Sequence, residues 1–161
     1  MTRIDFYKLA SGDPRQRRLL TCRIVEKAWR TRIKIYILAT DHEEARALDD
    51  LLWTFRQGSF IPHAVLPEEG TATDGVSILI GVQTQPPPGY SELLVNMKLD
   101  HNGQVEAFER AIMVLNEDAH ILRMGRQRYK EYREAGHQIE THFFDASGNA
   151  TAGPPPAQEN A

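Results

Sequence analysis

A strand pattern runs directly into a helix start in the stretch Ile33-Lys34-Ile35-Tyr36-Ile37-Leu38-Ala39-Thr40-Asp41-His42-Glu43-Glu44. The first part is apolar and rich in β-branched side chains, which is typical of a buried strand. Asp41, followed three residues later by Glu44, matches the capping box that satisfies the first free amides of a helix. The stretch therefore predicts a strand and then a helix that ends between Phe55 and Gly58. The inward face of this helix is expected to carry Ala45, Leu48 and Leu52.

The same alternation continues on both sides of this stretch. Asp13 before Pro14 predicts a helix start, because proline suits the first helical position, and Gly136 suits a left-handed helix end. Further strands are predicted at residues 4–9, 76–81, 93–97 and 137–144, and further helices after Pro14, through 105–115 and at 118–135. The alternation predicts an α/β fold with Rossmann-like layers: a mostly parallel central sheet with helices on both faces.

The end of the chain differs in composition from the rest. From Ala146 onward the residues are mainly Ala, Gly, Pro, Asn and Gln. Such a segment buries too little apolar surface to form a core. The sequence therefore predicts a single α/β domain at residues 1–144 and a disordered Pro/Ala/Gly-rich tail at residues 145–161.

The composition narrows the classes of function. The formal net charge is -3, and the 161 residues include a single cysteine. Proteins that bind DNA through its phosphates are usually basic, so direct DNA contact is not expected. One cysteine allows no internal disulfide, and no apolar run approaches the ~20 residues that a membrane helix needs. These features predict a cytoplasmic protein without a signal peptide or a membrane segment.

Motifs for catalysis or cofactor binding are missing from the sequence. It contains neither a Gly-x-Gly-x-x-Gly loop nor a phosphate loop that ends in Gly-Lys-Ser/Thr. The histidines lack metal-ligand spacing, and Cys22 lies on the apolar face of a predicted helix, where a thiol is buried and inert. We predict no catalytic residue, cofactor or metal. An α/β enzyme that binds a nucleotide or phosphate remains the alternative, although Asp13 would repel an anion at the first strand-to-helix turn.

The segment around Trp53 carries more large apolar side chains than one helix face can bury. Leu48 and Leu52 already take the core-facing positions, and Phe60 follows the helix next to a proline that interrupts strand pairing. Trp53 and Phe60 are therefore either core aromatics or an exposed aromatic patch that binds a partner.

A second segment combines positive charge with apolar and aromatic side chains. Leu122, Arg126 and Tyr129 share one face of the predicted helix at 118–135, and Arg123 and Lys130 flank them. A guanidinium beside an apolar surface suits a peptide carboxylate next to a hydrophobic side chain. An ordinary solvated basic helix and a phosphate-binding helix are the two other interpretations.

The chain resembles the chi subunit of the bacterial DNA polymerase III holoenzyme over roughly residues 1–144. The matching blocks are Phe6-Tyr7-x-Leu9, Cys22 with Ala28-Trp29, Leu48-Asp49-x-x-Leu52-Trp53, Ser59-Phe60-Ile61-Pro62-His63 and Arg126-x-Arg128-Tyr129-Lys130-x-Tyr132-Arg133-x-x-Gly136. The order and spacing of the tryptophan and histidine blocks make the resemblance specific. It implies the chi-subunit fold, which has no nucleotide site.

The resemblance also implies a function in DNA replication. Chi is a non-catalytic accessory subunit of a complex with DNA-directed DNA polymerase activity. It forms a heterodimer with the psi subunit, which links it to the clamp loader. On another surface it binds the acidic C-terminal tail of single-stranded-DNA-binding protein, without touching DNA itself. A chain of this family is thus expected to be a cytoplasmic adaptor at the replisome.

The resemblance carries over to individual positions. Trp53 and Phe60 match positions that family members use to bind psi. Positions of the tail-binding pocket are matched by Leu115, Arg126 and Tyr129, with Arg126 facing the terminal carboxylate. Leu122 stands where the family uses a lysine one turn before this arginine, so the neighbouring Arg123 is the substitute cation that the resemblance suggests.

Overall fold

The computed structural model describes residues 2–58, 60–66 and 76–153 of the chain. Along these residues the elements are β1 (Arg3–Leu9), α1 (Pro14–Trp29), β2 (Ile35–Leu38), α2 (His42–Thr54), β3 (His63–Val65), β4 (Ile78–Gly81), β5 (Leu93–Asn96), the short 3-10 helix η1 (Val105–Ala107), β6 (Arg110–Leu115), α3 (Ala119–Glu134), β7 (Gln138–Phe144) and β8 (Ala150–Thr151). Within this described part, no helix is both long enough and apolar enough to cross a bilayer.

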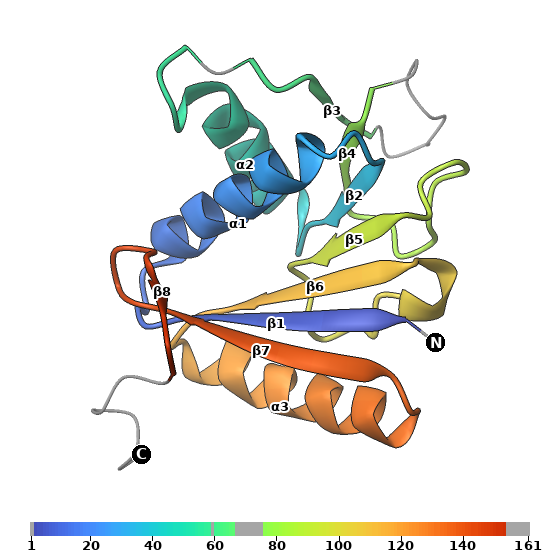
Figure 1. The fold of residues 1–161 in the computed structure, drawn as a ribbon. Coiled ribbons are helices and arrows are strands. Elements are labelled where there is room, and N and C mark those ends of the chain that lie inside the picture. The colour runs from blue at the N-terminus through green and yellow to red at the C-terminus, as the bar shows by residue number, and fades with distance from the viewer. Residues whose placement is uncertain (1, 59, 67–75, 154–161) are drawn as a thin grey trace.

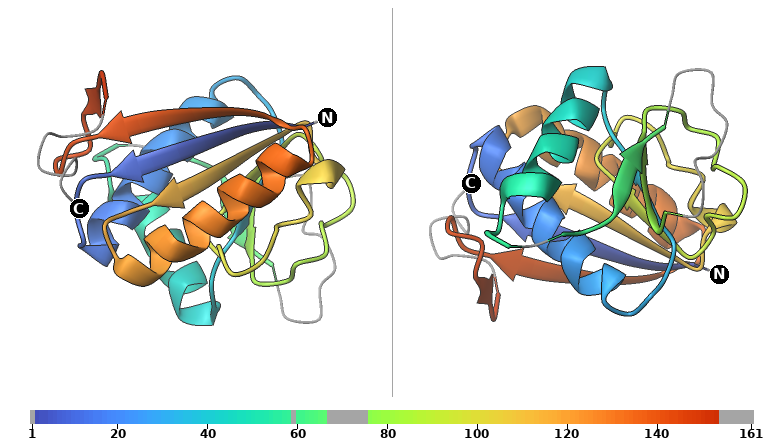
Figure 2. Two further views of the ribbon diagram at one scale, coloured as in Figure 1. Left: turned by 90° about the horizontal axis from the view of Figure 1, so that it is seen from below. Right: turned by 90° about the horizontal axis from the view of Figure 1, so that it is seen from above.

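The strands of the described residues form one eight-stranded sheet at the centre of the molecule, in the order β3-β4-β2-β5-β6-β1-β7-β8. Neighbouring strands are parallel except β7 and β8, which are antiparallel. Helices α1 and α2 cover one face, while α3 lies alongside β6 on the other (Figures 1 and 2). The prediction of a single-domain α/β fold, with a mostly parallel sheet between helices, is therefore confirmed.

Local capping explains where the helices begin. Asp13 directly precedes Pro14, the first residue of α1, and its carboxylate accepts a hydrogen bond from the Arg15 amide. At α3, the Asp118 carboxylate accepts from the amides of the first helical turn. At α2 the Asp41 carboxylate accepts from the Glu44 amide at 2.8 Å, as the capping box predicts. The return bond differs from the prediction, because Oε1 of Glu44 accepts from the amide of Thr40. These bonds fix the start of each helix at the end of a strand or loop.

The helix predicted through residues 105–115 is wrong. Residues 105–107 form η1, Phe108 is extended, and residues 110–115 form strand β6. The spacing of Val105, Phe108, Ile112 and Leu115 fits a helix, but it also fits a strand that is buried on both faces. Because β6 pairs with both β5 and β1, residues 111–115 are all buried and show no alternation of polar and apolar side chains.

The predicted disordered tail is partly corrected. Ala150 and Thr151 form β8, which pairs with Phe143 and Phe144 of β7. The Asp145 carboxylate accepts from the amides of Ser147 and Asn149, and this turn brings the chain back onto β7. Backbone pairing therefore orders residues that have no apolar core of their own. The remaining predicted tail, residues 154–161, lies outside the described residues, and the division at residue 144 stays a prediction.

Candidate functional site

A pocket of about 320 Å³ lies between α3 and the strands β6, β1 and β7. Its strand side is made by Leu115, Lys8 and Phe143, which are register partners on these three neighbouring strands. Phe6 and Thr141, one pleat earlier, also line it. Side chains two residues apart on a strand point to the same face, so the parallel register gathers these five residues beside α3.

The helix side of the pocket is made by Leu122, Gly125, Arg126 and Tyr129. They share one face of α3, as their spacing predicts. Tyr129 is 39% exposed, and its ring packs edge-on against that of Phe6, with the ring centroids 5.4 Å apart. The pocket thus brings together Leu115, Arg126, Tyr129 and Leu122, four of the five pocket residues that the resemblance suggests.

Gly125 lets α3 approach the sheet at this pocket. A Cβ atom built on Gly125 would overlap the Cδ2 atom of Leu115, which is buried at the end of β6. Glycine is therefore the residue that allows the backbone of α3 and the Leu115 side chain to lie in contact. Gly125 does not stand out in the sequence, because a mid-helix glycine shows its packing role only when the facing strand is known.

The charges around the pocket differ from the expectation for Arg123. This arginine is not among the residues that line the pocket, and its Nη2 atom lies 2.9 Å from Nδ1 of His120. Leu122 lines the pocket as an apolar residue. The cationic groups at the pocket are Arg126 on α3 and Lys8 on β1, and the Lys8 Nζ lies 5.8 Å from the centre of the Phe143 ring.

A second surface, formed by Trp53 at the end of α2 and Phe60 before β3, lies away from this pocket. Trp53 is 48% exposed and Phe60 is 79% exposed. Within the described ranges, the exposed large apolar side chains are these two, Val65 and Tyr129. The two aromatics therefore lie outside the core, which favours the partner-binding interpretation of this segment over the core interpretation.

A buried histidine holds this surface together. Nε2 of His63 lies 2.9 Å from Oδ1 of Asp49, and Nδ1 lies 2.7 Å from the carbonyl oxygen of Ile61. The His63 side chain is fully buried, and the Trp53 ring packs on it with centroids 4.3 Å apart. Asp49 and His63 thus join two segments that are separate in sequence. This contact could not be foreseen from the sequence, because Asp49 on α2 and His63 on β3 meet only when the two elements pack together.

The two surfaces lie toward opposite edges of the sheet. β3 is the strand at one edge, whereas β7 and β8 lie at the other, with five strands between β3 and β7 (Figure 1). Trp53 and Phe60 lie near β3, and the pocket lies beside β7. This separation leaves room for one partner at each edge at the same time.

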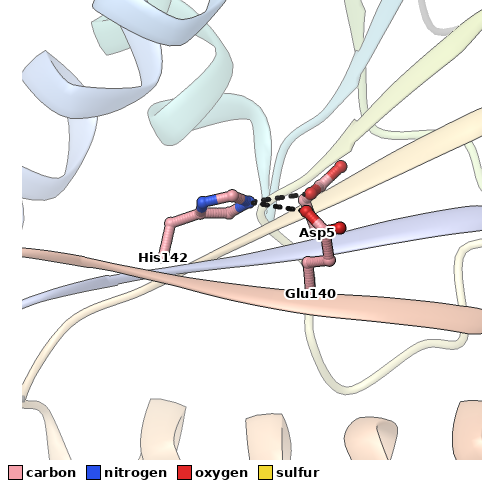
Figure 3. A group of neighbouring side chains, drawn as sticks. All are labelled: Asp5, Glu140 and His142. Carbon is pink, nitrogen blue, oxygen red and sulfur yellow. Dashed lines mark hydrogen bonds and ion pairs between the residues drawn. The ribbon is translucent and has the colours of Figure 1, made fainter. Parts of the chain in front are cut away.

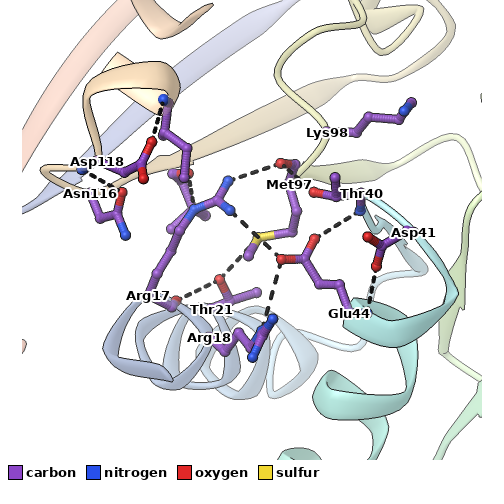
Figure 4. A network of polar contacts seen from close by, with 12 residues as sticks. Arg17, Arg18, Thr21, Thr40, Asp41, Glu44, Met97, Lys98, Asn116 and Asp118 are labelled. Atoms are coloured by element: carbon purple, nitrogen blue, oxygen red, sulfur yellow. Dashed lines mark hydrogen bonds and ion pairs between the residues drawn. The ribbon is translucent and has the colours of Figure 1, made fainter. Parts of the chain in front are cut away.

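The carboxyl ends of the strands test the nucleotide-binding alternative. In open α/β sheets, ligands bind at the carboxyl ends of two neighbouring strands whose following connections run toward opposite edges of the sheet. Here these strands are β2, which connects to β3, and β5, which connects to β6. The guanidinium of Arg17 lies there, with Nε 2.8 Å from the carbonyl oxygen of Val114 and Nη2 2.9 Å from that of Met97 (Figure 4). Its Nη1 lies 3.7 Å from Glu44, which is also buried.

Five carboxylates line this crevice, whose volume is about 380 Å³, together with Arg17, Arg18 and His120. Phosphate groups would meet carboxylates there instead of free helix amides, because aspartates cap the three helices. The crevice therefore does not fit a nucleotide. The carboxylates that line it are Asp41, Glu43, Glu44, Asp100 and Asp118.

The single cysteine does not have the properties of a catalytic nucleophile. Burial raises the pKa of the Cys22 thiol to about 12, whereas a reactive thiol needs a lowered pKa.

Three potential metal ligands, Asp5, Glu140 and His142, meet on β1 and β7 (Figure 3). The sequence gives no sign of this group, because Asp5 lies far along the chain from the two residues of β7 and reaches them only through the strand register. Oδ1 of Asp5 lies 2.8 Å from Nε2 of His142, and Oδ2 lies 2.8 Å from Nε of Arg110. Both oxygens thus have cationic or N–H partners, an arrangement that fits an ion-pair network better than a metal site.

The surroundings of Asp5 stabilise its charged form. Burial by itself would raise the pKa of the Asp5 carboxyl. Hydrogen bonds from His142 and Arg110, together with the charges of Arg110 and Arg3, instead hold that pKa below its ordinary value of 3.8. Because the folded state lowers this pKa, the carboxylate stabilises the fold above about pH 4. That contribution is lost as the pH falls through the folded-state pKa.

Asp5→Asn is expected to lower the free energy of unfolding at pH 7 by on the order of 2 kcal/mol, because it leaves a buried amide facing Arg110. The variant should also lose less stability than the unchanged protein when the pH is lowered from 5 toward 3. Urea unfolding across this pH range measures both effects. Glu140→Gln is the control, with an expected change within about 0.5 kcal/mol, because Glu140 is half-exposed and its ion pairs are long. Equal losses in the two variants would contradict the role of Asp5.

Comparison with known proteins agrees with these features. Residues 1–140 match the family described as "DNA polymerase III chi subunit, HolC". The chain is 36% identical to the DNA polymerase III subunit chi of Pseudomonas aeruginosa over 142 residues, which cover 88% of this chain and 96% of that protein. It is 25% identical to the Escherichia coli protein of the same name over 122 residues, covering 76% and 82% of the two chains. The α/β fold, the match over nearly all of residues 1–144 and these identities together show that the chain belongs to the DNA polymerase III chi subunit family.

Proposed function

We propose that this chain is a non-catalytic connector in DNA replication. It bridges the clamp loader, through the psi subunit, to the C-terminal tail of single-stranded-DNA-binding protein. Membership of the chi family supports the replication role. The single observation that carries the tail-binding part is the pocket between α3 and the sheet, where an arginine adjoins an apolar floor. The half-exposed Trp53 and exposed Phe60 support the psi-binding part.

The pocket suits the carboxyl terminus of a peptide better than an internal segment. A terminal aromatic or large apolar side chain would pack against Leu115 and Tyr129, and the terminal carboxylate would accept from the guanidinium of Arg126. A guanidinium offers two parallel N–H donors that match the two oxygens of a carboxylate. Because the pocket is open to water, this pairing should weaken as the salt concentration rises.

Arg126→Ala is expected to weaken binding of an acidic, phenylalanine-terminated peptide roughly tenfold, which corresponds to the loss of one charge-assisted pair. The measurement is isothermal titration calorimetry with a synthetic peptide whose carboxyl terminus is free. Amidation of that terminus should weaken binding to the unchanged protein by a similar factor, and it should have little further effect in Arg126→Ala.

Arg133→Ala is the matched control for this experiment. Arg133 is exposed on the same helix but is not among the residues that line the pocket. The substitution Arg133→Ala removes the same charge as Arg126→Ala, but it should leave the affinity for the peptide unchanged if the effect of Arg126 is specific to the pocket. Equal affinity of the unchanged protein and Arg126→Ala for the free-carboxyl peptide would refute the tail-binding assignment.

A further inference from the structure

Two cations face the pocket between α3 and the sheet, here called the tail pocket, and neither has an acidic partner of its own. Arg126 reaches it from α3, and Lys8 reaches it from β1, the central strand of the pocket floor. Within the described residues, no carboxylate lies within ion-pair distance of Lys8 or Arg126. The chain as a whole is acidic, with a net charge of -3. Two unpaired like charges at one pocket repel each other unless an anion lies between them.

Lys8 is held in place by its neighbours on both sides. Its register partners are Leu115 on β6 and Phe143 on β7, and all three residues line the pocket. The ammonium group lies 5.8 Å from the centre of the Phe143 ring, within the range of a cation–π contact. The position of Lys8 is thus set by the sheet and not by α3.

The helix side of the pocket offers a single cation. Leu122 contributes an apolar side chain, and Arg123 is engaged with His120 away from the lining residues. The second cation among the lining residues therefore stands on the sheet side, and it is Lys8.

We infer that Lys8 is a specificity-determining residue of the tail pocket, which pairs with an acidic side chain shortly before the carboxyl terminus of the bound peptide. This inference rests on the proposed tail-binding function and deepens it. Arg126, with its planar fork, takes the terminal carboxylate, whereas the compact ammonium of Lys8 accepts a carboxylate in many orientations. The preferred partner is therefore a peptide that has an acidic residue near its end as well as a large apolar last residue.

The apolar floor argues for a peptide over a nucleic acid in this pocket. Leu115 and Phe143 on the strand side, and Leu122 on the helix side, offer contact area to an apolar side chain. The two cations are too few for the multiple phosphate contacts that give DNA its affinity. Competition by a short single-stranded oligonucleotide at moderate salt would overturn the inference.

The test compares two synthetic peptides that both end in phenylalanine with a free carboxyl group. One has aspartates before the phenylalanine, and the other has serines in their place. Lys8→Met should weaken the aspartate peptide roughly three- to tenfold, as expected for a partly exposed ion pair, and should leave the affinity for the serine peptide unchanged. Lys130→Met, an exposed cation on α3 outside the lining residues, is the matched control and should change neither affinity.

A second variant makes the charge interpretation sharper. Leu122→Lys places a cation on the opposite side of the same pocket, so adding it to Lys8→Met should restore much of the lost affinity for the aspartate peptide. Calorimetry at two salt concentrations should show a weaker salt dependence for Lys8→Met than for the unchanged protein or the restored double variant.

Failure of this inference and failure of the proposed function are distinguishable. If the unchanged protein binds neither peptide, both are overturned. If it binds and Arg126→Ala weakens binding while Lys8→Met does not, the tail-binding function stands and the role of Lys8 is refuted. A loss that is equal for the two peptides also refutes it, because such a loss comes from packing against the floor and not from an acidic partner.

Discussion

Arg17→Leu is expected to lower the free energy of unfolding by about 3–5 kcal/mol, the range for removing one partner of a buried ion pair. Arg17 is only 4% exposed, and its guanidinium donates to the carbonyl oxygens of Val114 and Met97. Leucine replaces the volume but none of the donors. The two carbonyl groups, at the carboxyl ends of β6 and β5, and the buried Glu44 of α2 then each lose a partner.

Urea unfolding followed by circular dichroism measures this loss. The control is Arg15→Leu, because Arg15 lies on the same helix and is exposed. It should change the free energy of unfolding by less than about 0.5 kcal/mol. If Arg17→Leu does not fold at all, Glu44→Gln removes the other half of the pair and should give a smaller, measurable loss. Unchanged unfolding midpoints in both Arg17→Leu and Glu44→Gln would contradict the structural role of this network.

The double variant Trp53→Ala/Phe60→Ala is expected to weaken psi binding by about a hundredfold, or roughly 2.7 kcal/mol. Large aromatic side chains that are exposed in the free protein gain most when a partner covers them, and both fit this description. The measurement is the dissociation constant for purified psi from the same organism, determined by surface plasmon resonance. Because psi binding is proposed from the family and the exposed aromatics, an affinity within twofold of the unchanged protein would refute the assignment of this surface.

Two controls separate binding from folding in this experiment. The melting temperature of the double variant should fall only modestly, because Phe60 is exposed and Trp53 is half-exposed, with its ring packed on that of His63. Arg126→Ala should bind psi normally, since it lies at the other edge of the sheet. Conversely, the double variant should still bind the acidic peptide.

Beads coated with single-stranded-DNA-binding protein should then capture psi only in the presence of a chain that has both surfaces intact.

Local sequence signals predicted most of the secondary structure, since they depend on residues within one helical turn. Asp13 before Pro14, Asp41 before Glu44 and Asp118 before the last helix each cap a helix through their own side chains. The failure at residues 105–115 has the opposite cause. A strand between two neighbours is buried on both faces, and its run of apolar residues carries no period that distinguishes it from a helix.

The exposed aromatics could be suspected from sequence but not decided. Counting apolar positions around Trp53 showed more large side chains than one helix face can bury. Whether the excess lay inside or outside depended on the packing of α2 against the sheet. The structure leaves Trp53 on the buried His63 ring and Phe60 in solvent. Burial is a property of the assembled layers, so the sequence narrowed the choice and the packing resolved it.

By itself, the sequence determined the α/β class, the starts of α1, α2 and α3, the lack of nucleotide-binding motifs and the one helix face that carries Leu122, Arg126 and Tyr129. Only the tertiary structure decided what faces that helix. β1, β6 and β7 become neighbours through pairings that span about a hundred residues or more, and this register places Lys8 and Phe143 opposite Arg126. Side chains that are distant in sequence have no local pattern in common, so a pocket built across three strands is visible only once the strands have been paired.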